Sequence, residues 1–309
     1  MHPLVLEKIK KSYGPVNAVS DVSFDVREGE IFGLIGPDGA GKTSIMRMIV
    51  SLLVADSGTI SFFGKDVNTQ NSYVRANIGY MPQRFSLYQD LSVEENLSFF
   101  GDLFNVAKEI KQKRLKRLYT FSKLEPFKKR FAGDLSGGMK QKLALSCMLM
   151  HEPKVMVLDE PTFGVDPVSR MEFWEILGEL RSEGITLVVS TPYMDEAERC
   201  NRIGLINHGK LLGLDAPQNI INNFEWPVYR VESDSPHILY NQLIKIYDNK
   251  SIQLNADGVH IVDHKKEGLE AITKEIRDKV NMKNAPQEIK PALENIFLDL
   301  MQSQIEENE

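Results

Sequence analysis

Cysteine and long apolar runs are both scarce in this chain. Two cysteines, Cys147 and Cys200, occur among 309 residues, which is too few for a disulfide framework and favours a reducing compartment such as the cytosol. No segment approaches the roughly 20 apolar residues of a membrane-spanning helix, and the first residues lack a signal-peptide pattern. We therefore expect a protein on the cytoplasmic side. If it serves a membrane process, another chain must supply the membrane-spanning part.

An excess of positive charge is also missing. The 37 Lys and Arg residues are outnumbered by 43 Asp and Glu residues, which gives a formal net charge of -6. Proteins that bind a nucleic-acid backbone normally carry a basic surface, so we expect no nucleic acid among the partners. With 42% hydrophobic and 26% charged residues, the composition is that of a globular chain long enough for one large or two modest domains.

A complete phosphate loop is present near the N-terminus. Residues 36–43 match G-x-x-x-x-G-K-[ST] and lie between an apolar run (30–35) and a helix-like run (44–49), the context that this motif requires. Its backbone amides can surround an anion, with Lys42 at the outer phosphates and the Thr43 hydroxyl on Mg²⁺. A mere tight turn is the alternative, and the Lys-Thr pair disfavours it. The expected nucleotide-binding residues are Gly36, Pro37, Asp38, Gly39, Ala40, Gly41, Lys42, Thr43 and Ser44.

A second possible anion-binding end occurs further along the chain. Residues 135–139, Leu-Ser-Gly-Gly-Met, begin a run that can be helical as far as Met150. A hydroxyl and bare backbone amides at a helix start suit an anion, although Leu-Ser-Gly-Gly alone is also an ordinary helix-capping turn. Since one phosphate loop already accounts for one nucleotide, this second site needs a different explanation.

Two adjacent acids follow the next apolar run. Asp159 and Glu160 end the segment 155–160 directly before Pro161. Hydrolysis of a γ-phosphate needs charge neutralisation and a positioned water, so we expect Asp159 to hold Mg²⁺ through water and Glu160 to orient or deprotonate the attacking water. The alternative is a strand-end turn with two solvated acids.

In combination these motifs resemble the ATP-binding-cassette (ABC) ATPases over about residues 4–215. In that family two domains enclose ATP between the phosphate loop of one and the signature of the other. The resemblance therefore implies ATP and Mg²⁺ as cofactors and a second ABC ATPase subunit as a partner. The signature, which would serve the nucleotide of the other subunit, corresponds to Leu135, Ser136, Gly137, Gly138 and Met139.

The resemblance also assigns roles to single residues. Tyr13 matches the aromatic residue that stacks on adenine, and Asp166 matches the loop that communicates across the dimer. Gln83 matches the glutamine loop, where the side chain senses Mg²⁺. The implied metal residues, acting partly through water, are Thr43, Gln83 and Asp159.

Two segments are candidates for contact with a membrane permease. After the glutamine loop, Phe85, Leu87 and Tyr88 would be partly exposed for such a contact, although they could equally belong to the core. Residues 91–131 form a basic, helix-rich insertion that opens with a capping box at Ser92, and the family places its signature-bearing helical subdomain here. We interpret the positive charges of this insertion as a solvated helix face.

Two positions depart from the family pattern. Asp38 stands where the family usually has asparagine, and we expect its carboxylate to point away from the phosphates or to cap a turn. Pro192 replaces the switch histidine, which removes a side-chain donor. Either a partner with a histidine compensates, which favours a heterodimer over a homodimer, or Thr191 or Tyr193 substitutes in a homodimer.

The pattern along the chain predicts an α/β fold. Alternating segments at 5–9, 19–26 and 59–63 predict antiparallel strands, whereas short apolar runs from residue 155 onward predict buried parallel strands between helices. We expect a P-loop NTPase core with an antiparallel β subdomain and a helical subdomain. The nucleotide-binding domain is predicted to span residues 1–222, and a small C-terminal α+β accessory domain to span 223–309.

The C-terminal segment 291–298 resembles the tail of daunorubicin-type drug exporter ATPases. The resemblance therefore implies an ATP-hydrolysing subunit of an export system, peripheral on the cytoplasmic face of the cell membrane, that drives a separately encoded multi-span permease. One alternative is a soluble cassette ATPase without a permease, but such chains usually carry two cassettes or a coiled-coil insertion. The other is a regulatory cassette with low turnover, which Pro192 favours and Glu160 opposes.

Overall fold

The computed structural model describes residues 2–84, 87–255, 257–279 and 284–306. The chain divides into two compact units, Met1–Leu214 and Asp215–Glu309. This division falls before the boundary expected at 222. The reason is that α8 (Pro217–Asn222), which the sequence placed in the first domain, packs against α11 (Leu293–Glu306) of the second unit.

A six-stranded sheet forms the centre of the first unit. Its strand order is β10-β9-β3-β8-β7-β6, and the pairs β3–β8, β3–β9, β7–β8 and β6–β7 are parallel. Every residue of β3 and β7 is buried, as the apolar runs predicted. The strands are β3 (Ile31–Ile35), β6 (Ile78–Met81), β7 (Val155–Asp159), β8 (Thr186–Thr191), β9 (Arg202–Asn207) and β10 (Lys210–Asp215).

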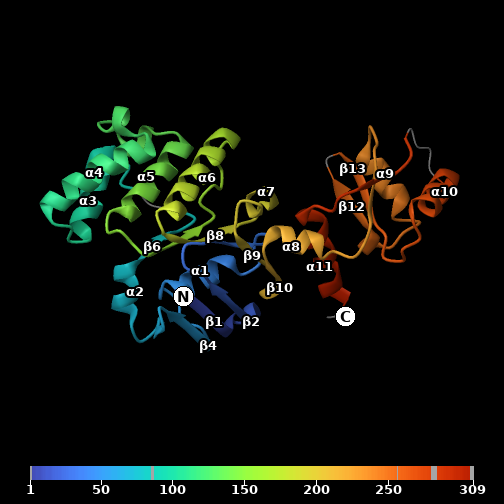
Figure 1. The fold of residues 1–309 in the computed structure, drawn as a ribbon, viewed down its shortest axis with the longest axis horizontal. Helices are drawn as coiled ribbons and strands as arrows, with labels where there is room; N and C mark the ends of the chain where they lie inside the picture. The colour runs from blue at the N-terminus through green and yellow to red at the C-terminus, as the bar shows by residue number, and fades with distance from the viewer. Residues whose placement is uncertain (1, 85–86, 256, 280–283, 307–309) are drawn as a thin grey trace. The chain divides into compact units, whose positions relative to one another are not determined.

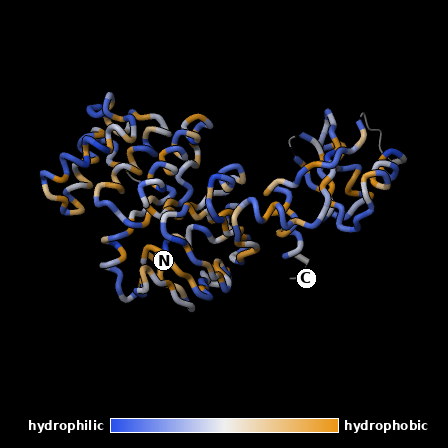
Figure 2. Tube along the Cα trace, in the orientation of Figure 1, coloured by the Kyte–Doolittle hydropathy of each residue, from blue (hydrophilic) through white to orange (hydrophobic). Residues whose placement is uncertain are grey.

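A second sheet of the first unit is antiparallel in its main pairs, in the order β2-β1-β4-β5. Hydrophobic residues of these strands, orange around the N-terminus in Figure 2, join a core cluster with α1 that runs from Leu4 to Ile206. This arrangement confirms the expected β subdomain. The strands are β1 (Leu4–Tyr13), β2 (Val16–Val26), β4 (Ser57–Phe62) and β5 (Lys65–Asp66).

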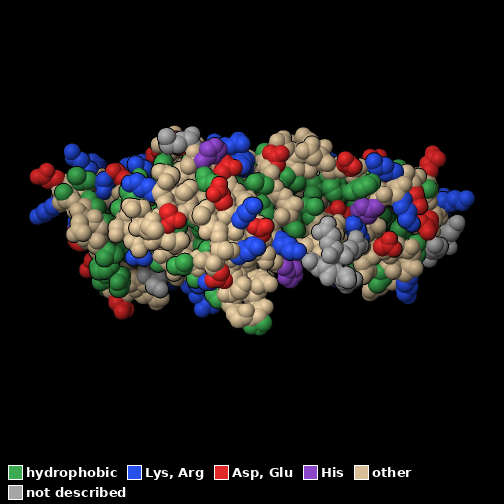
Figure 3. Space-filling model, turned by 90° about the horizontal axis from the view of Figure 1, so that it is seen from below, with side chains coloured by type: hydrophobic (Ala, Val, Ile, Leu, Met, Phe, Trp, Pro, Cys, Tyr) green, Lys and Arg blue, Asp and Glu red, His purple; other side chains and the backbone are tan. Residues whose placement is uncertain are grey.

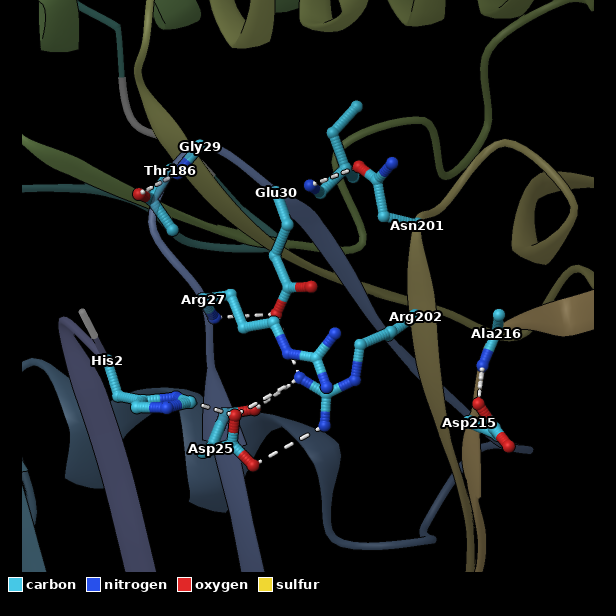
Figure 4. A network of polar contacts seen from close by, with 11 residues as sticks. His2, Asp25, Arg27, Gly29, Glu30, Thr186, Asn201, Arg202, Asp215 and Ala216 are labelled. Atoms are coloured by element: carbon cyan, nitrogen blue, oxygen red, sulfur yellow. Dashed lines mark hydrogen bonds and ion pairs between the residues drawn. The ribbon is translucent and has the colours of Figure 1, made fainter.

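Arg202 connects the two sheets by a polar network (Figure 4). From the start of β9 its guanidinium lies 3.2 Å from Asp25 Oδ2 at the end of β2 and 3.1 Å from Glu30 Oε1 just before β3. Burial alone would raise the pKa of Asp25, but the hydrogen bonds and charge of Arg202 hold that pKa below its usual value. The network therefore fixes where the chain enters β3, the strand that leads into the phosphate loop.

Helices α3 to α6 lie together on one side of the central sheet (Figure 1). Ser92 caps α3 in a reciprocal capping box with Glu95, as predicted. The helices of the first unit are α1 (Lys42–Ile49), α2 (Asn71–Asn77), α3 (Val93–Leu103), α4 (Lys108–Ser122), α5 (Gly137–Leu149), α6 (Pro167–Ser182) and α7 (Met194–Ala197), with 3-10 turns at Glu125–Phe127 and Ala132–Asp134.

The second unit has an α+β fold of its own. Its antiparallel sheet has the order β12-β13-β11-β14, and its core gathers around Val231, Leu243 and Ile276. The short strand β14 was not predicted. The elements are β11 (Val228–Val231), α9 (Pro236–Leu243), a 3-10 turn (Asn249–Ser251), β12 (Ile252–Asn255), β13 (Gly258–Val262), α10 (Leu269–Lys279), β14 (Gln287–Ile289) and α11.

No helix within the described ranges is long and apolar enough to cross a membrane. Acidic and basic side chains are interspersed on the face shown in Figure 3. Both cysteines are buried free thiols, and burial raises the pKa of each, so neither suits nucleophilic chemistry.

Candidate nucleotide site

The predicted site residues follow neighbouring parallel strands at the same edge of the sheet. The phosphate loop follows β3, Glu160 follows β7, and Pro192 follows β8. The register pairs Ile35 with Thr191 and Asp159 with Ser190, so these strand ends are level. Crevices outside the carboxyl ends of parallel strands are where open α/β sheets bind ligands.

Two glycines shape the phosphate loop. A Cβ on Gly41 would lie 2.3 Å from the carbonyl oxygen of Ala18, and the φ of 102° at Gly41 is one that other residues rarely adopt. A Cβ on Gly36 would lie 2.1 Å from the carbonyl oxygen of Ile206. The loop thus packs closely on neighbouring backbone and leads directly into α1, where amides at the helix start favour an anion.

Lys42 and Glu160 face each other at the centre of the site. The Lys42 side chain is 3% exposed. Its ammonium donates to the carbonyls of Gly36 (2.8 Å) and Pro37 (2.9 Å) and lies 3.0 Å from Glu160 Oε1. Gln83 donates its amide to the other oxygen of Glu160 at 2.7 Å. A phosphate group that entered this loop would therefore compete with Glu160 for Lys42.

Asp159 has the features of a residue that contacts a cation. Its Oδ1 accepts from the hydroxyls of Thr43 (3.2 Å) and Ser190 (2.7 Å), whereas Oδ2 is buried with no hydrogen-bond partner among the described residues. An unpartnered buried carboxylate oxygen is costly unless another group satisfies it. Mg²⁺ fits this donor set, because it is usually held by one or two carboxylates together with waters and phosphate oxygens.

Glu160 has an unusual backbone conformation. Its φ is 49°, a value that is rare and costly for a residue with a side chain. The Glu160 N–H donates to Ser190, both to the carbonyl oxygen at 3.1 Å and to Oγ at 3.0 Å. Sequence reasoning missed Ser190, although its place at the end of an apolar strand was the available signal.

Tyr13 and Ser44 come together at the entrance to the loop. Their hydroxyl oxygens are 3.3 Å apart, and the Tyr13 side chain is 47% exposed, so its ring is accessible to a flat ligand. Asp38 is exposed. Of the possible permease contacts, Tyr88 is exposed beside Phe99, Leu87 is half-buried, and Phe85 lies outside the described residues.

The signature residues form a second cluster with α6. Ser136 caps α5 by accepting from the Met139 N–H at 3.3 Å, and Ser136 and Gly137 are exposed. At Gly138 a Cβ would lie 2.5 Å from the side chain of Ser169. Asp166 caps α6 by accepting from the Ser169 N–H at 3.0 Å, a bond that lowers the pKa of Asp166. Leu135 is buried, whereas the two residues that follow it at the helix start are exposed.

The residues that flank Pro192 are already engaged. The Thr191 hydroxyl is fully buried and donates to Glu196 at 2.6 Å. The guanidinium of Arg170 lies 4.2 Å from the ring centroid of Tyr193. Sequence reasoning assigned no role to Glu196 or Arg170. Glu196 lies within the segment 190–198 that resembles the switch of the family, but only tertiary packing brings Arg170 of α6 to it.

A separate cavity of about 690 Å³ lies at the other end of the core strands. Its walls include Phe63, Arg114, Leu180 and Thr186, and it contains no residue of the phosphate loop. The large size of this cavity does not make it the chemical site, because the phosphate loop, Asp159 and Glu160 converge elsewhere.

Comparison with known proteins places these features in a family. A family model described as ABC transporter matches residues 19–163. YbhF of Escherichia coli strain K12, a probable multidrug ABC transporter ATP-binding protein, is 40% identical over 92% of this chain but only 49% of YbhF. The chain thus spans about half the length of that relative. Nod factor export ATP-binding protein I of Burkholderia lata is 39% identical over 72% of this chain and 73% of that protein.

Solved structures confirm the fold. An ATP-binding subunit of an ABC transporter superposes with a TM-score of 0.64 at 29% identity, covering 72% of this chain and 92% of that one. The ADP conformation of MJ1267, an ATP-binding cassette of an ABC transporter, gives a TM-score of 0.66 at 26% identity, over 72% and 96% of the two chains. The P-loop NTPase fold predicted from the motifs is therefore correct. The chain belongs to the family of ABC transporter ATP-binding proteins.

Proposed function

We propose that this chain binds and hydrolyses ATP as the energising subunit of an ABC export system. The observation that carries the proposal is the convergence of Lys42, Asp159 and Glu160 at one edge of the sheet. Phosphoryl transfer needs a fixed positive charge for the phosphates, a carboxylate for a metal ion and a candidate base. Lys42, Asp159 and Glu160 would supply these three parts in that order. Export is supported by the names of the relatives, a multidrug transporter component and a Nod factor export protein.

In this proposal each residue has a defined task. The loop amides and Lys42 bind the outer phosphates, and Tyr13 stacks on the base. Thr43 and the unpartnered Oδ2 of Asp159 would hold Mg²⁺, which neutralises charge on the phosphates when bound. Glu160 accepts a proton from the attacking water.

A second cassette completes the site in this proposal. Ser136 and Gly137 are exposed at the start of α5, where they can face the nucleotide of a partner subunit. We favour a heterodimer, because Pro192 lacks a side-chain donor and the Thr191 hydroxyl already donates to Glu196. The other partner would be a multi-span membrane permease, which this subunit would bind from the cytoplasmic face of the membrane.

One observation favours a second candidate function. The engaged Thr191 and the donor-free Pro192 are also compatible with a regulatory cassette that binds ATP but hydrolyses it slowly. Phosphate release by the purified full chain, alone and together with proteins that co-purify from membranes, separates the two functions. Lys42→Ala serves as the blank, and Lys116→Ala, at an exposed lysine, serves as the matched control.

The expected result is ATP-dependent phosphate release that Lys42→Ala abolishes and Lys116→Ala preserves, since Lys42 supplies the fixed positive charge of the loop. Binding of a fluorescent ATP analogue should be lost with Lys42→Ala as well. ATP binding without turnover, alone and in the assembly, would favour the regulatory function. Unchanged ATP binding by Lys42→Ala would contradict the assignment of the phosphate loop.

A further inference from the structure

The carboxylate of Glu196 lies where three segments beside the candidate site meet. Glu196 is 1% exposed, and its Oε1 accepts from Thr162 Oγ1 at 2.7 Å and from Arg170 Nε at 3.2 Å. Its Oε2 accepts from Thr191 Oγ1 at 2.6 Å. A buried carboxylate is tolerated only when its oxygens are hydrogen-bonded and its charge is compensated, and these three donors meet both conditions.

Each donor belongs to a segment with a proposed role in hydrolysis. Thr162 follows Glu160 by two residues, and Arg170 lies in the first turn of α6, which the dimer-loop aspartate caps. Thr191 directly precedes Pro192. A single carboxylate therefore joins the segment of the candidate base, the dimer loop and the switch segment.

Arg170 strengthens the same connection from the side of α6. Its guanidinium pairs with Asp195 at 2.8 Å and stacks on the ring of Tyr193. The Tyr193 N–H donates to the Thr191 hydroxyl at 3.1 Å. The residues on both sides of the switch position are thus held by contacts that lead to Glu196 or Arg170.

The conformation of Glu160 depends on this segment. A residue at a φ of 49° keeps that conformation only when its surroundings hold it there. The Glu160 N–H donates to Ser190, which is bonded directly to Thr191 in the chain. A shift of Thr191 would therefore be transmitted to Glu160 through one residue.

We propose that Glu196 is a positioning residue for ATP hydrolysis, a role that rests on the proposed ATPase function. By holding Thr162 and Thr191, it fixes the chain on both sides of the Ser190 contact and so keeps Glu160 aimed at the site of the attacking water. In a chain whose switch position is Pro192, the segment has no side-chain donor of its own at that position, so its placement depends on this buried carboxylate.

The first test replaces Glu196 by glutamine in the full chain, which removes the charge and turns one acceptor oxygen into a donor. We expect kcat for ATP hydrolysis to fall about 10- to 100-fold, the scale of a small misplacement of a catalytic group, while the Kd of a fluorescent ATP analogue changes by less than about twofold. Glu198→Gln is the matched control, because it removes the same charge from an exposed position two residues away and should leave both values unchanged.

A double mutant separates positioning from general loss of structure. If Glu196 acts through Glu160, then adding Glu196→Gln to Glu160→Gln should reduce the residual single-turnover rate by less than about twofold. If Glu196 had a merely structural role, Glu196→Gln would lower the rate by the same factor in the wild-type chain and in the Glu160→Gln variant. Should Glu196→Gln fail to fold, Thr162→Val removes one hydrogen bond to the same carboxylate and nearly keeps the shape of the side chain. This variant should also lower kcat.

The inference is overturned if Glu196→Gln or Thr162→Val keeps the wild-type kcat, or if the losses are equal in both backgrounds. An increase in the Kd of the ATP analogue equal to the loss in kcat would also overturn it, since that pattern indicates a damaged binding site. A wild-type assembly that hydrolyses no ATP would instead defeat the proposed function, and the inference with it.

Discussion

The ammonium of Lys42 and the carboxylate of Glu160 are 3.0 Å apart, and both side chains are almost completely buried. Without this contact each group would be a buried charge with no oppositely charged partner, so the contact stabilises both. It also holds the phosphate-loop lysine on the residue that we propose as the base. Binding of a phosphate chain must therefore exchange one anionic partner of Lys42 for another.

Glu160→Gln should slow hydrolysis strongly without weakening ATP binding. The amide keeps the shape of the side chain but cannot accept the proton, and loss of a general base costs about 100- to 10,000-fold in rate. Because the variant also removes the anion that competes for Lys42, the Kd for a fluorescent ATP analogue should stay equal or fall. Phosphate-release assays and titrations check the two expectations. Wild-type turnover by this variant would remove Glu160 from the mechanism.

Pro192→His should raise the ATPase rate of the isolated protein. A side-chain donor that stabilises charge in the transition state contributes about 100- to 1,000-fold, and the Thr191 hydroxyl cannot supply it while it donates to Glu196. Pro192→Ala is the control, since it removes the proline ring without adding a donor. Steady-state ATPase of the isolated protein and of a co-purified assembly provides the measurement. Fast turnover by the isolated wild-type homodimer, with no gain from Pro192→His, would defeat the heterodimer proposal.

The second unit should lose stability as the pH falls below about 6.5, the ordinary pKa of histidine. Asn295 Nδ2 donates to His260 Nδ1 at 2.9 Å, so the neutral ring carries its proton on Nε2, which faces Asp257 at 3.2 Å. Burial lowers the pKa of His260 and outweighs the opposing effect of Asp257, while Arg230 lowers it further and Glu294 raises it. As the pH is lowered, the unfolded chain therefore binds the proton before the folded one does. The free energy of unfolding of the second unit then decreases by at most about 1.4 kcal/mol for each pH unit.

Thermal melts between pH 7 and pH 5 test this dependence. They are read from the fluorescence of Trp226 in a Trp174→Phe background, since Trp226 packs on His264 in the same unit. His260→Asn keeps an acceptor for Asn295 but does not titrate, so its melting temperature should depend less on pH than that of the parent. His237→Asn, at an exposed histidine, is the control. Equal pH dependence in all three proteins would contradict the prediction.

Removal of residues 216–309 should leave a folded core that still binds ATP. The hydrophobic cluster of the first unit is built from residues between Leu4 and Ile206, and the second unit has a separate cluster. We expect a cooperative melt and an unchanged Kd for a fluorescent ATP analogue. A melt without a cooperative transition would show that the cut divides a single folding unit.

The sequence by itself determined the local chemistry of this protein. The phosphate loop has a fixed spacing between glycines and the Lys-Thr pair, and such a loop requires a strand before it and a helix after it. The acids at 159 and 160 end an apolar run, which places them at the end of a buried strand. The capping box at Ser92 is equally local. These features depend on residues within one turn or one strand, so they could be predicted without knowledge of the fold.

The tertiary structure decided which of these segments meet. Thr43 and Asp159 are 116 positions apart in the chain, and Lys42 contacts Glu160 only because β3, β8 and β7 lie side by side in that order. The order of the parallel strands cannot be predicted from one sequence, because all of these strands are similarly apolar and they pair through backbone hydrogen bonds. For the same reason the gathering of Thr162, Arg170 and Thr191 around Glu196 was not predicted. The placement of α8 in the second unit likewise depends on packing against α11, a contact between helices far apart in the chain.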